Sequence, residues 1–190
     1  MAPSAMDLLA PRTVIASGPE YLAGPFNIKV SGTQKFIGRA DFETADFAPK
    51  PIIVREEPYE WFIEPKKSAS ANEPLYYNLI AGGAAAGHWT AEGNKVSSFV
   101  APVEGQEAAS KLQLQHVGGS IEKGFTYYIK QANESVAGKP KSGAWYVDSV
   151  DELAPVLAGT RGRASTFRFV SLARPSPIDI HLGPVKVDIV

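Results

Sequence analysis

Residues 26–38 read FNIKVSGTQKFIG, and this stretch decides the fold class. Apolar side chains occupy every second position from Phe26 to Val30, Gly32 offers a turn, and apolar residues resume at Phe36. Alternation with a period of two on both sides of a glycine turn predicts a β-hairpin. Two further short strands, expected at 51–54 and 59–63, complete a four-stranded unit that closes at Pro65.

The same order of strands returns twice along the chain. The opening strands, taken at Ile28, Tyr77 and Tyr128, are 49 and 51 residues apart. The closing strands, taken at Phe62, Gln113 and Arg168, are 51 and 55 residues apart. Three units of about fifty residues with four strands each predict a β-trefoil, in which each weak unit buries its apolar face against the other two. A two-sheet sandwich is the alternative fold, but it gives no reason for a threefold spacing.

We therefore expect an all-β protein in three parts. An irregular N-terminal arm covers 1–25, a β-trefoil covers 26–172, and an extended C-terminal tail covers 173–190. The three repeats lie at about 26–65, 75–117 and 125–172, with one short helix-compatible stretch at 107–110. Isoleucine and valine alternate in the tail, which is typical of a terminal strand packed on the core or on a partner.

Composition and charge exclude several classes of function. The chain has 190 residues, and 19 Lys and Arg balance 20 Asp and Glu to a net charge of −1, so we expect no nucleic-acid partner. The absence of cysteine excludes disulfides, thiol catalysis and Cys-ligated zinc, and favours a reducing compartment. Neither a signal-peptide pattern nor a run of 18 apolar residues occurs, so we expect a cytoplasmic protein without a membrane partner.

No motif for catalysis, for a cofactor or for a metal stands out. The segment Gly82–Trp89 imitates a phosphate-binding loop, but His88 and Trp89 stand where lysine and a hydroxyl residue are needed. A glycine-rich hairpin turn explains these glycines. The three histidines, His88, His116 and His181, lie far apart in the sequence, and the carboxylates are scattered. We predict that the chain is not an enzyme and has no catalytic, cofactor-binding or metal-binding residues.

Short motifs in all three units carry a resemblance to a known family. The first unit contains Ile28–Gly32, Phe36–Arg39, Ala48–Ile52 and Trp61–Glu64; the second contains Leu79–Ala84 and Gly93–Val96; the third contains Tyr128–Lys130, Trp145–Val147 and Phe167–Phe169. In this order and spacing, over about residues 26–172, they resemble the mushroom serine-protease inhibitors of the β-trefoil class. The resemblance implies a cysteine-free, intracellular fungal protein that inhibits serine proteases through an exposed loop, without a cofactor, as a defence against animals that eat the fungus.

In that family, the loop that inhibits trypsin joins the second and third strands of the first unit and carries a basic side chain. The corresponding residues here are Phe42, Glu43, Thr44, Ala45, Asp46 and Phe47, and none of them is basic. A trypsin-like S1 pocket carries a buried aspartate, which would repel the acidic residues of this loop. We therefore expect weak or absent trypsin inhibition. Thr44 or Ala45 suits an elastase-like pocket, and Phe42 or Phe47 suits a chymotrypsin-like pocket.

Other readings of the sequence stay open. Arg161 and Arg163, each followed by a small residue, form an alternative protease-contact loop in the third unit, or they contact an anion. A carbohydrate-binding β-trefoil lectin is the alternative function, although the Gln-x-Trp signature of ricin-type lectins is absent from all three units. The loop at 42–47 is otherwise a solvated acidic loop without a target. Lys50 follows this loop, but the next residue, Pro51, makes it a poor bait for a protease.

Overall fold

The computed structural model describes residues 22–41, 48–66, 75–88, 94–98, 111–131, 135–136, 139–140, 143–159 and 163–172. Over these residues the chain forms strands and turns, without a helix, and every strand pairing is antiparallel. The fourteen strands are β1 (Gly24–Val30), β2 (Phe36–Arg39), β3 (Lys50–Arg55), β4 (Glu60–Lys66), β5 (Tyr76–Ala81), β6 (Ala84–His88), β7 (Val96–Ser98), β8 (Leu112–Ser120), β9 (Gly124–Gln131), β10 (Ser135–Val136), β11 (Lys139–Pro140), β12 (Ala144–Val147), β13 (Val156–Gly159) and β14 (Thr166–Ser171). The predicted all-β class is confirmed.

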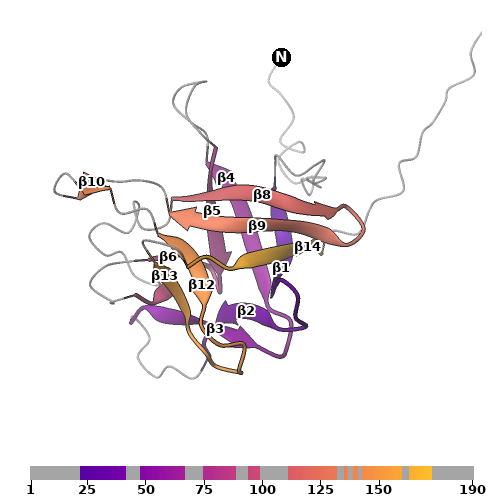
Figure 1. The fold of residues 1–190 in the computed structure, drawn as a ribbon, viewed down its shortest axis with the longest axis horizontal. Coiled ribbons are helices and arrows are strands. Elements are labelled where there is room, and N and C mark those ends of the chain that lie inside the picture. Colours follow the sequence, from indigo (N-terminus) through magenta and orange to yellow (C-terminus); the bar gives the residue numbers. More distant parts are fainter. Residues whose placement is uncertain are drawn as a thin grey trace, which may run out of the picture.

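Twelve of these strands belong to one sheet, and six of the twelve close into a ring. β1 pairs with β4, β4 with β5, β5 with β8, β8 with β9, β9 with β14, and β14 returns to β1. The long β8–β9 hairpin crosses one end of the molecule in Figure 1, with β4, β5, β1 and β14 beside it. Because the ring is closed, each of these six strands pairs with a neighbour on both sides, and none is an edge strand.

Three hairpins, β2–β3, β6–β7 and β12–β13, extend from this ring. They also contact one another. β3 pairs with β7 through Lys50 and Ser98, Ile53 forms a bridge with Pro155, and Lys95 forms a bridge with Leu157. Because three segments far apart in the sequence meet here, each hairpin is supported by the other two.

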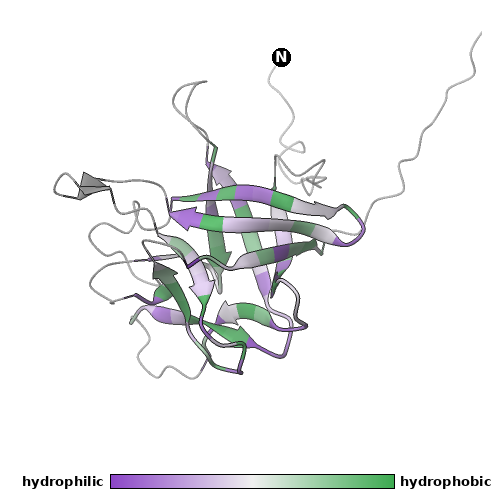
Figure 2. Cartoon of the chain, viewed as in Figure 1, coloured by the Kyte–Doolittle hydropathy of each residue, from purple (hydrophilic) through white to green (hydrophobic). Residues whose placement is uncertain are grey.

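Alternating side chains fill the inside of the ring. On β1, Phe26, Ile28 and Val30 are buried, whereas the residues between them are half-buried. Phe169 on β14 lies edge-on to Phe26, with 6.3 Å between ring centres, and edge-on to Tyr127 on β9 at 5.2 Å. Such edge-to-face pairs add about 0.5–1.5 kcal/mol each to the burial of their rings. The hydropathy pattern in Figure 2 shows the same alternation along the strands.

Two tryptophans are fully buried, but their indole N–H groups differ. Trp61 on β4 donates from Nε1 to the carbonyl oxygen of Ile37 on β2, at 2.8 Å, and so joins the ring to the first hairpin. Trp145 on β12 is equally buried, and its Nε1 has no hydrogen-bond partner in the part of the chain that the structure describes.

Several predicted boundaries can be compared with the structure. β1 begins at Gly24 rather than at Phe26, and Leu22 is buried, so the last residues of the predicted arm pack on the core. β4 does not close at Pro65 but continues to Lys66; a proline, which lacks an N–H, is tolerated this close to a strand end. Gly82 and Gly83, with φ of 59° and 80°, form the hairpin turn predicted in place of a phosphate-binding loop.

Three predicted segments lie outside the described residues: most of the N-terminal arm, at 1–21, the helix-compatible stretch at 107–110 and the C-terminal tail at 173–190. A search of the described residues finds no helix that is long and apolar enough to cross a membrane.

Candidate functional site

The loop predicted to contact a protease starts and ends on a paired hairpin. Phe42, Glu43, Thr44, Ala45, Asp46 and Phe47 lie outside the described residues, but the residues on both sides of them are described. β2 and β3 pair in register, with Gly38 opposite Ile53 and Arg39 opposite Ile52. One residue further, the N–H of Ala40 donates to the carbonyl oxygen of Pro51 at 2.9 Å. The two ends of the loop are therefore held at a fixed separation.

Arg55, the last residue of β3, binds the residue that directly precedes this loop, Asp41. Its Nη1 donates to the carbonyl oxygen of Arg39 and to Oδ2 of Asp41, both at 2.7 Å. Its guanidinium also lies 5.2 Å from the ring centre of Tyr59. The Arg55 side chain is 22 % exposed, whereas that of Asp41 is 67 % exposed, so the arginine is the more firmly packed partner. One side chain thus connects both strands of the hairpin to the start of the loop.

Tyr59 forms a packed support under the hairpin. A Cβ atom on Gly38 would lie 2.4 Å from Cγ of Tyr59, so only glycine allows the strand to approach this ring. Beside it, Nη1 of Arg39 donates to the carbonyl oxygen of Gly82 at 3.2 Å. Burial raises the pKa of Tyr59; Asp41 also raises this pKa, whereas Arg39 and Arg55 lower it. The phenol therefore stays neutral well beyond neutral pH.

A surface hollow of about 320 Å³ opens beside the start of the loop. It is lined by residues of the first hairpin and of the β12–β13 turn, namely Asp41, Ile53, Arg55, Glu57, Glu152 and Leu153. Leu153 is 56 % exposed and has a φ of 67°, which a residue with a Cβ rarely adopts. Its N–H donates to the carbonyl oxygen of Val54 at 2.9 Å, and the N–H of Val54 donates to Ala154 at 2.8 Å. These bonds hold the Leu153 backbone in this conformation and leave its apolar side chain exposed at the hollow that Asp41 also lines.

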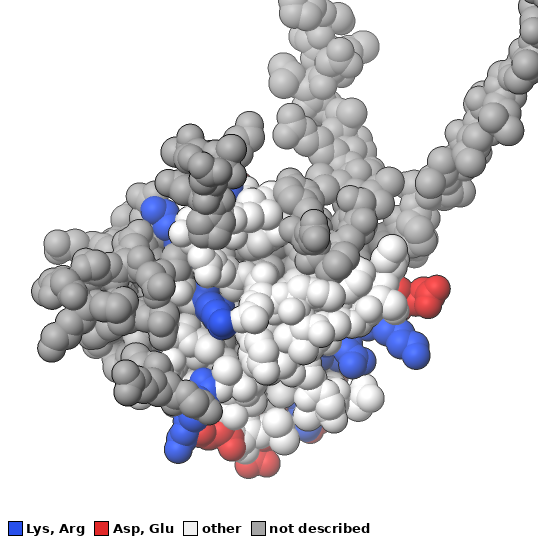
Figure 3. All heavy atoms as spheres, turned by 45° about the horizontal axis from the view of Figure 1, so that its top comes forward, with Lys and Arg blue, Asp and Glu red and all other residues white. Residues whose placement is uncertain are grey.

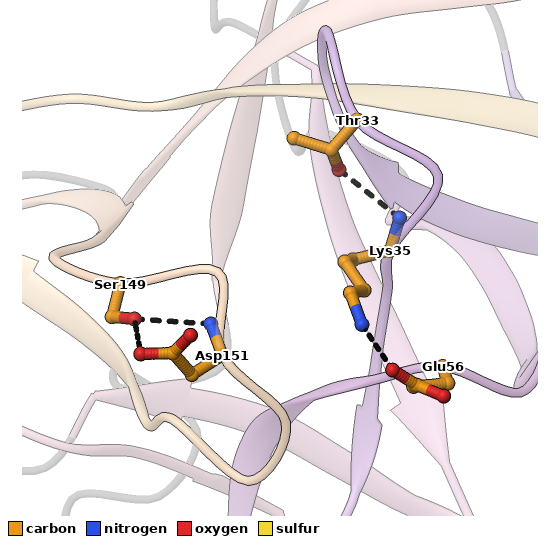
Figure 4. A network of polar contacts seen from close by, with 5 residues as sticks. All are labelled: Thr33, Lys35, Glu56, Ser149 and Asp151. Atoms are coloured by element: carbon orange, nitrogen blue, oxygen red, sulfur yellow. Dashed lines mark hydrogen bonds and ion pairs between the residues drawn. The ribbon is translucent and has the colours of Figure 1, made fainter.

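Polar contacts stiffen the turns around the hairpin. In the β12–β13 turn, Oγ of Ser149 contacts Oδ2 of Asp151 at 2.6 Å and accepts the N–H of Asp151 at 3.0 Å (Figure 4). On the neighbouring side, Lys35 forms an ion pair with Glu56. The hydrogen bond and the charge of Lys35 lower the pKa of Glu56, so this carboxylate stays ionised to lower pH than usual.

The structure describes two of the basic residues that the sequence analysis considered, namely Lys50, which was predicted to be a poor protease contact, and Arg163 of the alternative loop. Lys50 is only 6 % exposed and lies opposite Ser98 of β7, so it belongs to the packed sheet rather than to the loop. Arg163 is exposed, but its Nη1 lies 3.0 Å from Oδ1 of Asp148, and its guanidinium lies 5.9 Å from the ring centre of Tyr146. Arg161 lies outside the described residues.

The described residues show neither a broad basic patch on the face drawn in Figure 3 nor a group of side chains arranged around a metal ion. On the face drawn in Figure 3, the described Lys and Arg side chains are scattered among neutral residues instead of forming one basic patch. Among the residues that the structure describes, no group of three or more His, Asp or Glu side chains is arranged to hold a metal ion.

Sequence reasoning missed Arg55 and Leu153 as parts of this site. Arg55 could have been found, because the sequence places a basic residue at the end of the strand that follows an acidic stretch. No sequence signal marks Leu153, since the stretch Asp151–Pro155 does not show that a leucine, rather than a glycine, adopts a positive φ.

Comparison with known proteins gives a likeness of fold. No family model matches the sequence, and no curated protein matches it. Among solved structures, the chain is similar to a proteinase inhibitor from the mushroom Coprinopsis cinerea, with a TM-score of 0.57 and 18 % identity over 80 % of this chain and 99 % of that one. It is also similar to a salivary protein of Culex quinquefasciatus from the Cysteine and Tryptophan-Rich family, with a TM-score of 0.54 and 11 % identity over 78 % of this chain and 94 % of that one.

The first of these matches confirms the predicted resemblance to a mushroom proteinase inhibitor, at the level of the fold. The second match is to a member of a family named for its cysteines, whereas the present chain has none. The shared feature is therefore the arrangement of strands and not a disulfide framework.

Proposed function

We propose that this chain is a protease inhibitor-like binding protein that binds serine proteases through the loop at 42–47. The observation that carries the proposal is the fixed base of this loop, formed by the paired β2–β3 hairpin and the Arg55 contacts with Arg39 and Asp41. The likeness in fold to the Coprinopsis cinerea inhibitor supports it. We place the protein in the β-trefoil class, which the closed ring of six strands and the three hairpins support, and we propose a cytoplasmic, fungal defence role.

Holding the two ends of the loop in place favours binding, because ordering a loop on binding costs conformational entropy. Ordering one residue costs about 1–2 kcal/mol of backbone entropy, so a loop whose ends are already held loses less on binding than a free segment. In this way the scaffold supports affinity, while the residues at the tip of the loop select the protease. The charges of the loop determine which proteases it can bind. Arg55 compensates the charge of Asp41, but the charges of Glu43 and Asp46 would repel a pocket with an aspartate at its base.

The deciding experiment compares the wild type with Ala45→Arg in inhibition assays against trypsin, chymotrypsin and elastase. We expect weak or absent trypsin inhibition by the wild type. Ala45→Arg should lower the trypsin inhibition constant by at least about thirtyfold, because a basic side chain in this pocket contributes about 2 kcal/mol or more. Ala45→Gln is the matched control, since it adds length without charge and should not gain trypsin inhibition.

The same assays identify the alternatives. Strong trypsin inhibition by the wild type that disappears in Arg161→Ala or Arg163→Ala would show that the third-unit loop acts instead. If neither the wild type nor Ala45→Arg inhibits any of the three proteases, the loop is not inhibitory. Binding on a glycan array by such an inactive protein would support the carbohydrate-binding alternative.

A further inference from the structure

Two basic residues occupy opposite positions on neighbouring strands on the outside of the ring. Lys29 of β1 and Arg168 of β14 are direct partners in the antiparallel register. The residues on either side of each, such as Ile28 and Phe167, are buried, so these two side chains point outward. Like charges directly opposite each other destabilise a sheet. Neither side chain forms an ion pair with a carboxylate among the residues that the structure describes.

The turn between β1 and β2 forms a small hollow beside this pair. The hollow has a volume of about 50 Å³ and is lined by Lys29, Val30, Ser31, Gly32, Thr33, Gln34 and Arg168. Oγ of Ser31 is buried and has no hydrogen-bond partner within the described part of the chain. A buried hydroxyl without a partner is uncommon and costs free energy. The hollow is therefore lined by two basic residues without a carboxylate partner and by a serine whose buried hydroxyl has no partner among the described residues.

The walls of the hollow are held in place by contacts of their own. Oγ1 of Thr33 donates to the carbonyl oxygen of Val30 at 2.9 Å. It also accepts the N–H of Lys35 at 3.0 Å (Figure 4). The N–H of Val30 donates to the carbonyl oxygen of Lys35 at 3.0 Å. Nζ of Lys29 lies 3.2 Å from Oε1 of Gln34 and 4.8 Å from the ring centre of Phe36, which positions the ammonium over the turn. The turn and the Lys29 ammonium are thus held in place before any ligand arrives.

We propose that this hollow binds a single tetrahedral oxyanion, a phosphate or sulfate group. The guanidinium of Arg168 can donate to two oxygens, and the ammonium of Lys29 can donate to a third. The Ser31 hydroxyl, which is buried, can donate to a further oxygen once its side chain rotates toward the hollow. The charge excludes a cation. The volume of about 50 Å³ admits one small group and excludes a nucleoside or a sugar ring from the hollow itself. Binding would relieve the repulsion between Lys29 and Arg168 and satisfy the Ser31 hydroxyl.

The test is a titration of the ¹⁵N-labelled protein with sodium sulfate and with sodium phosphate, at an ionic strength held constant with sodium chloride. The amide signals of Ser31 and Gly32 should shift in a saturable way. Lys29→Gln and Arg168→Gln should each raise the dissociation constant at least about tenfold, because each removes a charged donor. Lys66→Gln is the control for lost charge, since Lys66 lies exposed at the end of β4, outside the hollow, and it should leave the constant unchanged.

Ser31→Ala provides a second, independent variant. It should weaken binding of the oxyanion without lowering the stability of the anion-free protein, because the hydroxyl that it removes has no described partner. Methyl phosphate distinguishes the source of the group: binding as tight as that of inorganic phosphate indicates a group carried on a larger molecule, and failure to bind indicates the free ion.

Three results would overturn the proposal. One is the absence of a saturable shift with either oxyanion. Another is an unchanged dissociation constant in the double variant Lys29→Gln/Arg168→Gln. The third is an equal response to acetate or chloride, which would show general attraction of anions instead of a site for a tetrahedral group.

Discussion

Trp61 and Trp145 allow one hydrogen bond to be measured against an unsatisfied donor. Both side chains are fully buried, and a Trp→Phe substitution removes the same atoms at either position. Only Trp61 has a partner for its Nε1–H, the carbonyl oxygen of Ile37 at 2.8 Å. The Nε1–H of Trp145 has none among the described residues. Replacing each tryptophan in turn therefore changes the core volume similarly but has opposite effects on hydrogen bonding.

The expected sizes follow from these contacts. The smaller ring leaves a cavity at either position, which costs about 1–2 kcal/mol, since complete truncation of a buried aromatic residue costs about 3–5 kcal/mol. Trp61→Phe also loses a hydrogen bond with a net value of about 1 kcal/mol. Trp145→Phe instead removes an unsatisfied buried donor and regains about 1–2 kcal/mol. Trp61→Phe should therefore be less stable than Trp145→Phe by about 2–3 kcal/mol.

Urea denaturation followed by far-UV circular dichroism measures this difference without depending on tryptophan fluorescence. The m-values of the two variants should agree, so that a shift in midpoint reports stability alone. Equal losses at the two positions, or a larger loss for Trp145→Phe, would refute the reasoning. Either result would mean that the Trp145 N–H is satisfied or that the two cavities differ more than the two hydrogen bonds.

Two further predictions concern the first hairpin and the turn beside it. Gly38→Ala places a methyl group against Tyr59 and should cost about 1–3 kcal/mol by urea denaturation, whereas Gly118→Ala, which meets open space, should stay within about 0.5 kcal/mol of the wild type. Equal effects would contradict the close approach at Gly38. Lys35 lowers the pKa of Glu56 from 4.5, so the stability that this ion pair contributes is present above about pH 4.5 and is lost as the pH falls through the lower pKa of the folded state. The stability difference between the wild type and Lys35→Met should therefore shrink between pH 6 and pH 3, and a difference that grows toward acid would show the opposite linkage.

The ring strands were predictable because they carry their own local signal. The strand predicted from Phe26 is observed as β1, and the apolar residues of its alternating pattern are the buried ones. The same holds for β14, where Phe167 and Phe169 are buried and Arg168 between them is exposed. In an antiparallel sheet with one buried face, apolar and polar residues alternate along each strand. The alternation therefore predicts both the strand and the side of it that faces the core.

The parts of the candidate site and of the β1–β2 hollow that depend on tertiary pairing could not be predicted in this way. Lys29 and Arg168 lie at opposite ends of the described chain, and only the β1–β14 pairing makes them neighbours. The contact of Arg55 with Asp41 depends on where the returning strand ends. The positive φ of Leu153 arises from backbone hydrogen bonds to β3, which override the local preference of a leucine. Each of these features comes from tertiary pairing, which no short stretch of sequence records.

The contacts at the loop base also explain how this scaffold could change its target without losing its fold. Arg55 binds the main-chain carbonyl of Arg39 and the side chain of Asp41, and the Ala40–Pro51 hydrogen bond is entirely main chain. None of these contacts uses a side chain from 42–47. Substitutions within the loop therefore leave its anchoring intact, since surface changes away from packed features alter stability by about 0.5 kcal/mol or less. In such an arrangement the hairpin determines how rigidly the loop is held, and the loop sequence is free to determine which protease pocket it fits.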